Sequence, residues 1–283
     1  MKDLPKAIVP LSGLDHCVDT FLLHGLEDVG YPVEGVSYKE FYESYNPRDN
    51  RIYICIEDGR NQGRMPDVEK LPFGLLKRNT VWYVTSQKFV DRIVRSRRLL
   101  GWVFASTMGL FRGMFDNGTL CSLLPYAASS FEIREKDNDV CSTADVESIP
   151  FLRSRWVFGK DWHRQMLNDF DRSRVGVVTT ENEISIYEML ACGTCVLITS
   201  KIWGEAIFGY PLPSFVGEFI DGQLTMSDVE NLIVTAEHTN AHNEAQLWAQ
   251  EFGTYRLRAQ MMLASLVDKK LLPERALHLG EKK

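Results

Sequence analysis

The stretch from residue 179 to residue 188 combines side chains that can bind a polar ligand. Glu181 lies in a polar, acidic loop, and Ser185 and Glu188 follow in a segment with helical periodicity. A carboxylate accepts two hydrogen bonds, which suits a vicinal diol, and the free N–H groups at a helix start attract phosphate. The stretch therefore predicts a site for a ligand with hydroxyl and phosphate groups. Ordinary capping, loop or surface glutamates are the alternative.

Two apolar strands flank this stretch. A β-branched run at 175–178 predicts the first strand, and residues 184–191 recur at helical spacing until Gly193 ends the helix. A second buried strand is expected at 196–198. Strands joined through one helix form a parallel β–α–β unit, which binds ligands where strand carboxyl ends meet helix N-termini. The residues at that place are Thr179, Thr180, Glu181, Ile184, Ser185 and Glu188.

The same stretch resembles the donor-site motif of GT-B glycosyltransferases. In that family an acidic loop precedes the pattern E-A-x-A-x-G-x-P-V, and residues 188–196 read E-M-L-A-C-G-T-C-V. Glu188 matches the glutamate that holds the ribose of a nucleotide-sugar. Glu181 lies one residue short of the usual spacing for its acidic partner, where it could hold a sugar hydroxyl, and Cys195 replaces the usual proline. Residues 175–200 carry this resemblance, and the rest of the chain matches only in layout.

The resemblance implies a fold and an activity. The fold is α/β, with two Rossmann-like lobes whose parallel sheets face a cleft, and with a C-terminal helix that crosses back onto the first domain. The activity is hexosyl transfer from a nucleotide-sugar to an acceptor hydroxyl. The implied donor is a uridine diphosphate sugar such as UDP-glucose, and GT-B enzymes typically use no bound metal.

The chain length allows two domains of ordinary size. We expect an acceptor-side domain at 1–128, a polar linker at 129–148, a nucleotide-sugar-binding domain at 149–265 and a tail at 266–283. In the first domain, periodicity predicts strands and helices in alternation. The strands are expected at 6–10, 33–38, 52–56, 81–85, 102–105 and 120–124, and the helices at 14–29 and 87–100.

The second half continues with further elements. A strand is expected at 151–158 and a helix at 161–170. Ser227 and Glu230 predict a capping box for a helix that runs to about His238. Asn240 is expected to cap one long helix at 241–267.

An inverting transfer needs a base that deprotonates the acceptor hydroxyl. Asp15 and His16 follow the first predicted strand, and Asp58, with Glu57, follows the strand at 52–56. Catalytic groups are often placed at strand carboxyl ends. Helix-start acids and ordinary turn chemistry are the alternatives.

The departing diphosphate needs positive charge around it. Arg153 and Lys160 lie in the run F-L-R-S-R-W-V-F-G-K, which loosely resembles the Arg and Lys pair that GT-B enzymes direct at the donor phosphates. Arg155 shares a strand face with Arg153. In the family, the loop at Ser12 and Gly13 touches the donor, and glycine lets the backbone approach closely. Surface charges and a plain turn are the alternatives.

Two cysteines form a C-x-x-C motif at Cys192 and Cys195. Redox motifs of this kind open a helix, whereas this one ends a helix, so the helix dipole disfavours a thiolate. A zinc site that adds His238 and His242 has ligand spacing. Asn240 between the two histidines predicts a helix cap instead.

Composition limits the partners and the compartment. The net charge is −6, which excludes an overall basic nucleic-acid binder. Basic clusters at 88–98 and 153–164 leave DNA as a possible acceptor, as in compact phage glycosyltransferases that modify hydroxymethylated bases. A two-lobed nucleotide- or nucleic-acid-binding protein without catalysis is the alternative. The scattered cysteines, with no signal peptide and no membrane span, predict a cytoplasmic protein.

Overall fold

The structure is a computed structural model that divides into two compact units. Unit 1 comprises residues 1–125 and 255–283, and unit 2 comprises residues 126–254. The side chains of residues 162, 183 and 206 are not described. The described residues are 4–13, 17–46, 49–57, 79–86, 88, 91, 102–116, 118–119, 121–131, 135–143, 162–179, 183–200, 202, 204–220 and 222–279.

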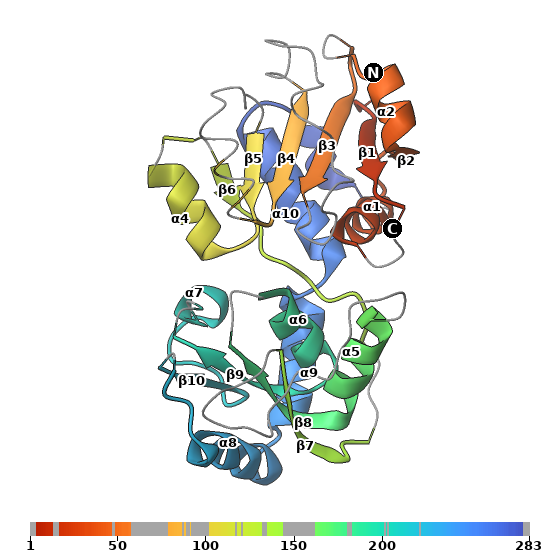
Figure 1. Cartoon of the computed structure of the whole chain (residues 1–283). Coiled ribbons are helices and arrows are strands. Elements are labelled where there is room, and N and C mark those ends of the chain that lie inside the picture. Colours follow the sequence, from red (N-terminus) through yellow and green to blue (C-terminus); the bar gives the residue numbers. More distant parts are fainter. Residues whose placement is uncertain are drawn as a thin grey trace. The chain divides into compact units, whose positions relative to one another are not determined.

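Unit 1 is built on a six-stranded sheet in the order β2-β1-β3-β4-β5-β6 (Figure 1), and all neighbouring strands are parallel. Strands buried on both faces are apolar almost throughout, and every residue of β3 and β4 is buried. The strands are β1 (Ala7–Leu11), β2 (Val33–Ser37), β3 (Ile52–Glu57), β4 (Thr80–Val84), β5 (Trp102–Ala105) and β6 (Cys121–Leu123).

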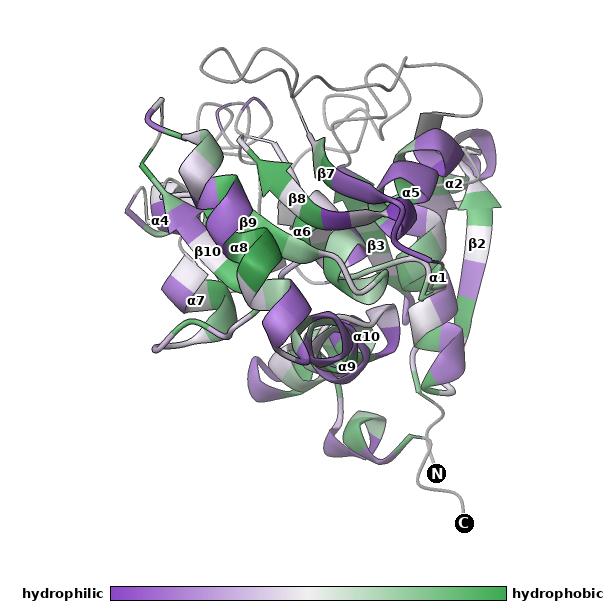
Figure 2. Ribbon diagram, turned by 90° about the horizontal axis from the view of Figure 1, so that it is seen from below, coloured by the Kyte–Doolittle hydropathy of each residue, from purple (hydrophilic) through white to green (hydrophobic). Residues whose placement is uncertain are grey.

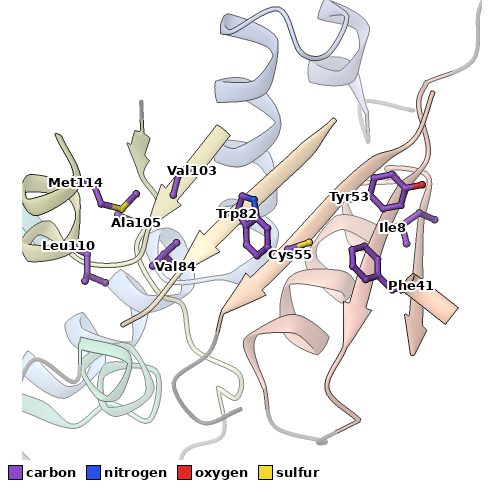
Figure 3. Close-up of a cluster of buried hydrophobic side chains, with 10 residues drawn as sticks. All are labelled: Ile8, Phe41, Tyr53, Cys55, Trp82, Val84, Val103, Ala105, Leu110 and Met114. Atoms are coloured by element: carbon purple, nitrogen blue, oxygen red, sulfur yellow. The ribbon is translucent and has the colours of Figure 1, made fainter. Parts of the chain in front are cut away.

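The helices of unit 1 complete its core. A buried cluster joins strand residues such as Tyr53 and Trp82 to Phe41 of α2 and to Leu110 and Met114 of α4 (Figure 3). C-terminal helix α10 packs along α1. The helices are α1 (Val18–Asp28), α2 (Tyr38–Ser44), α4 (Met108–Asp116), α10 (Tyr255–Asp268) and the 3-10 helix η3 (Glu274–His278).

Helix α2 was not expected from the sequence. Its signal is local, because Ser37 and Glu40 form a capping box in which each side chain binds the other's backbone N–H. The predicted helix at 87–100 falls almost wholly outside the described residues. All six strands predicted in unit 1 are confirmed, to within a residue or two at their ends.

Unit 2 holds a four-stranded parallel sheet in the order β10-β9-β8-β7. Opposite faces carry α6 and α8, because a Cβ on Gly176 would meet Met189 of α6 and a Cβ on Gly217 would approach Leu232 of α8. The elements are β7 (Asn138–Ser142), α5 (Trp162–Arg172), β8 (Ser173–Val178), α6 (Glu183–Ala191), β9 (Cys195–Thr199), α7 (Gly204–Phe208), β10 (Val216–Phe219), α8 (Met226–His238) and α9 (Ala241–Phe252).

Helix α8 of unit 2 is amphipathic. Figure 2 shows hydrophobic and hydrophilic residues side by side on α8, where Val229, Leu232 and Ala236 are buried. This pattern is typical of a helix that covers one face of a sheet. None of the helices in the described part of the chain is long and apolar enough to cross a membrane.

The structure confirms the α/β class with two parallel sheets and corrects several details. Part of the predicted linker is strand β7, an edge strand of mostly polar residues that are only partly buried. The capping box of α8 uses Thr225 and Asp228, two residues before the predicted pair. The strand expected at 151–158 lies outside the described residues.

The predicted single helix at 241–267 is also corrected. It is two helices, because α9 ends at Phe252 and Gly253 is its C-cap. Thr254 then pairs with Ala128 in an isolated parallel bridge. Helix α10 belongs to unit 1, so the chain division differs from the predicted boundaries at 149–265 and 266–283. A C-terminal helix on the first domain is what the resemblance implied.

Candidate functional site

The β8–α6–β9 segment forms the expected parallel unit. Val178 of β8 lies opposite Ile198 of β9, so Thr179 and Thr199 are adjacent at the carboxyl ends of the two strands. Gly193 ends α6 with a φ of 71°, a left-handed conformation that glycine adopts at low cost. Helix α6 therefore starts where these two strands end, the position that parallel sheets use for ligands.

Three hydroxyl groups at this edge have no hydrogen-bond partner among the described residues. They belong to Thr179, Thr199 and Ser185, the third residue of α6, and their oxygens are buried. An unpaired buried hydroxyl costs about 1–3 kcal/mol, and native proteins contain few of them. These three groups make this edge of the sheet the candidate site for a polar ligand. Ile184, beside Ser185, is half-buried.

Glu188 lies one turn further along α6 and is fully buried. Ser129 donates a hydrogen bond from its hydroxyl to Oε1 at 2.7 Å, and its backbone N–H lies 3.1 Å from each carboxylate oxygen. Nε2 of His163, on α5, lies 3.7 Å from Oε1. The sequence led us to expect a carboxylate open to a nucleotide. In the structure Glu188 is fully buried, and the partners of its carboxylate are internal.

Several predicted site residues lie outside the described residues. They are Asp15, His16, Asp58, Arg153, Lys160 and Glu181. Their roles stay predictions, and so does the ribose role of Glu188.

In unit 1, the loop after β1 is held by a carboxylate that the sequence analysis did not single out. Asp19 is fully buried in the first turn of α1, and its Oδ2 accepts a hydrogen bond from the Ser12 N–H at 2.6 Å. Gly13 has a φ of 73°, and no described residue other than its chain neighbours comes within 4 Å of a Cβ built on it. The loop is thus anchored at Ser12, while the backbone at Gly13 is open to close approach.

Glu57, at the carboxyl end of β3, has a structural role. It is 3% exposed, and its carboxylate accepts hydrogen bonds from the backbone N–H groups of Thr85 and Ser86, each at 3.0 Å. The Ser86 hydroxyl adds a third bond at 2.8 Å. These bonds fix the loop after β4 and occupy the carboxylate, so Glu57 is no longer a candidate base.

The C-x-x-C cysteines lie at the opposite, amino-terminal edge of the unit 2 sheet. Burial raises the pKa of the Cys192 thiol and of the Cys195 thiol to about 12, which disfavours the reactive thiolate. Nδ1 of His242 lies 3.7 Å from Cys195 Sγ and 2.8 Å from the Gly193 carbonyl oxygen. Among the described residues, no group of three or more His, Cys, Asp or Glu could hold a metal ion.

Little of the predicted basic clusters is described. Lys88 is exposed, whereas His163 is 2% exposed and lies against Glu188. His163 is therefore part of the unit 2 interior, which corrects its place in the cluster at 153–164.

Comparison with known proteins gave matches to solved structures at low identity. No family model and no curated protein matches the chain. The glycosyltransferase SnogD from Streptomyces nogalater matches 93% of this chain and 100% of its own at 10% identity, with a TM-score of 0.40. The glycotransferase of kitacinnamycin matches 95% of this chain and 98% of its own at 9% identity, with a TM-score of 0.39.

Proposed function

We propose that this protein transfers a sugar from a nucleotide-sugar, with a uridine diphosphate sugar as donor, to an acceptor hydroxyl. The observation that carries the proposal is the carboxyl-terminal edge of the unit 2 sheet, where the hydroxyls of Thr179, Ser185 and Thr199 have no hydrogen-bond partner among the described residues. A nucleotide-sugar offers the phosphate and hydroxyl oxygens that such groups need.

The proposed donor site uses the local chemistry of α6. The diphosphate lies at the helix N-terminus, where free N–H groups and the Ser185 hydroxyl donate hydrogen bonds to its oxygens. Glu188 accepts hydrogen bonds from the ribose hydroxyls. Arg153 and Lys160 balance the charge on the diphosphate, and Glu181 holds a sugar hydroxyl.

The reaction forms one bond and breaks another at the anomeric carbon. The acceptor oxygen bonds to this carbon while the bond to the diphosphate oxygen breaks, and the bonding electrons leave with the diphosphate. In an inverting reaction the acceptor proton passes to a base, for which Asp15, His16 and Asp58 are the candidates. Ser12 and Gly13 approach the donor. The proposal includes no metal ion.

The acceptor is proposed only as a hydroxyl compound. A hydroxylated DNA base is one candidate, on the basic residues at 88–98 and 153–164. DNA binding that weakens steeply with added salt supports this acceptor, because released counterions dominate such binding. Binding that salt does not affect argues against it.

A thermal-shift screen of nucleotides and nucleotide-sugars tests the donor, since a ligand that binds only the native state raises the melting temperature. Incubation of a binding donor with acceptors then tests transfer. Glu188→Gln is expected to abolish the shift. Glu244→Gln is the matched control, because Glu244 also accepts a serine hydroxyl, from Ser214 at 2.7 Å, but is itself exposed. Binding without turnover favours a nucleotide-binding protein, and no binding by any donor overturns the proposal.

A further inference from the structure

Ser129 gives Glu188 a pair of donors on one residue. Its N–H reaches both carboxylate oxygens and its O–H reaches Oε1. The two hydroxyls of a vicinal diol present the same chemistry, with two donors on neighbouring atoms that face one carboxylate. Ser129 thus satisfies the hydrogen bonds that a ribose would make.

We propose that Ser129 is an internal competitor for the donor nucleotide and sets the affinity of the site. This inference rests on the proposed function. In the ligand-free protein Ser129 holds the Glu188 carboxylate, and a nucleotide binds only when its ribose displaces Ser129. The observed affinity is then lower than the intrinsic affinity, by the cost of releasing Ser129.

The chain around Ser129 is firmly held on one side and loosely on the other. Ala128 is 3% exposed, and its N–H donates to the Gly253 carbonyl oxygen at 2.8 Å within the bridge to Thr254. Beyond Ser129, the described residues show a long bond, from the Gln246 side chain to the Phe131 carbonyl oxygen at 3.4 Å. Ser129 is itself half-buried. It can leave Glu188 by a change that starts after Ala128, without disturbing the bridge.

His163 supports the carboxylate from the other side. It comes from α5 and lies beside the same oxygen, Oε1, that the Ser129 hydroxyl binds. It is 2% exposed and does not belong to the Ser129 segment. Glu188 therefore keeps one neighbour when Ser129 leaves, and its position on α6 is retained for the incoming ribose.

The test compares nucleotide affinity in three serine variants by isothermal titration calorimetry with UDP and UDP-glucose. Ser129→Ala removes the hydroxyl bond and is expected to tighten binding about tenfold, which corresponds to one charge-assisted hydrogen bond. Ser129→Thr keeps a hydroxyl donor and is expected to bind as the wild type does. Ser214→Ala removes an equally short serine–glutamate bond at Glu244 and is expected to leave affinity unchanged.

The outcomes separate this inference from the proposed function. If Ser129→Ala binds more tightly and adding Glu188→Gln abolishes the binding, both the competitor role and the donor site are supported. Binding that appears only in Ser129→Ala also supports both. If the wild type binds and a folded Ser129→Ala binds equally or more weakly, the competitor role is overturned and the donor site stands. If neither protein binds any nucleotide, the proposed function fails and this inference fails with it. Circular dichroism establishes that each variant is folded.

Discussion

A Cβ atom built on Gly25 of α1 would lie 2.4 Å from the carbonyl oxygen of Tyr255, the first residue of α10. The two helices therefore approach backbone to backbone at this point, which only glycine permits. Phe21, one turn earlier on α1, packs against Tyr255, and the centroids of the two rings lie 5.3 Å apart. This contact explains why the C-terminal segment belongs to unit 1.

Substitution of Gly25 tests this contact. Gly25→Ala is expected to destabilise the protein by about 1–3 kcal/mol, because the added methyl group forces the helices apart. Gly109→Ala in α4 is the control, since the nearest atom would be Thr107 Oγ1 at 3.9 Å. It is expected to stabilise the helix by about 0.5–1 kcal/mol. Urea unfolding measures both, and equal effects would contradict the close packing.

The same substitution, Thr→Val, is expected to have opposite effects on stability at Thr199 and Thr194, which are both fully buried. Thr199→Val removes a hydroxyl that has no partner among the described residues, and it is expected to raise ligand-free stability by about 1 kcal/mol while weakening donor binding. Thr194→Val removes a hydroxyl bonded to the carbonyl oxygens of Phe170 at 2.5 Å and Ser173 at 3.0 Å. It is expected to cost about 1–3 kcal/mol. A loss of stability in Thr199→Val would argue against an empty polar site.

The buried thiols are expected to be unreactive in the native protein. All six cysteines are free, and burial raises the pKa of Cys141, Cys192 and Cys195 to about 12. A thiol-specific reagent such as DTNB at pH 7.5 should label these three slowly, and label all six in denaturant, because the thiolate is the reacting form. Rapid native labelling of Cys192 or Cys195 would revive the redox interpretation.

His242 is expected to make the protein less stable in acid. Burial lowers the pKa of His242 below its ordinary value, against the opposing effect of its bond to the Gly193 carbonyl. The folded state then binds fewer protons than the unfolded state, whose histidine pKa is about 6.5. The stability that neutral, buried His242 contributes is fully present above that pH, and it is lost as the pH falls through the pKa of His242 in the folded state. Melting temperatures between pH 7 and pH 5 should fall less steeply in His242→Asn, and parallel curves would contradict this.

Metal removal tests the proposed mechanism. If the diphosphate is neutralised by side chains and helix N–H groups alone, transfer should continue unchanged after exhaustive chelation. Assays with EDTA, and with Mg²⁺ or Mn²⁺ restored, measure this. Activity that disappears with EDTA and returns with the metal would contradict the metal-free proposal.

The sequence predicted the elements whose signals are local and strong. Unbroken apolar runs gave β3, β4, β8 and β9, and the helical spacing before Gly193 gave α6. The polar edge strand β7 and the break at Gly253 escaped prediction. Strand β7 exists only because it pairs with β8. The break at Gly253 is accompanied by a bridge to Ala128, which is distant in sequence.

The sequence by itself determined the α/β class, the parallel β8–α6–β9 unit and the polar residues at its edge, since these follow from periodicity and chain order. Only the tertiary structure decided that Asp19 and Glu57 anchor loops, and that Ser129 and His163 contact Glu188. The physical reason is that a buried carboxylate must find donors, and those donors come from other segments of the chain that folding brings beside it.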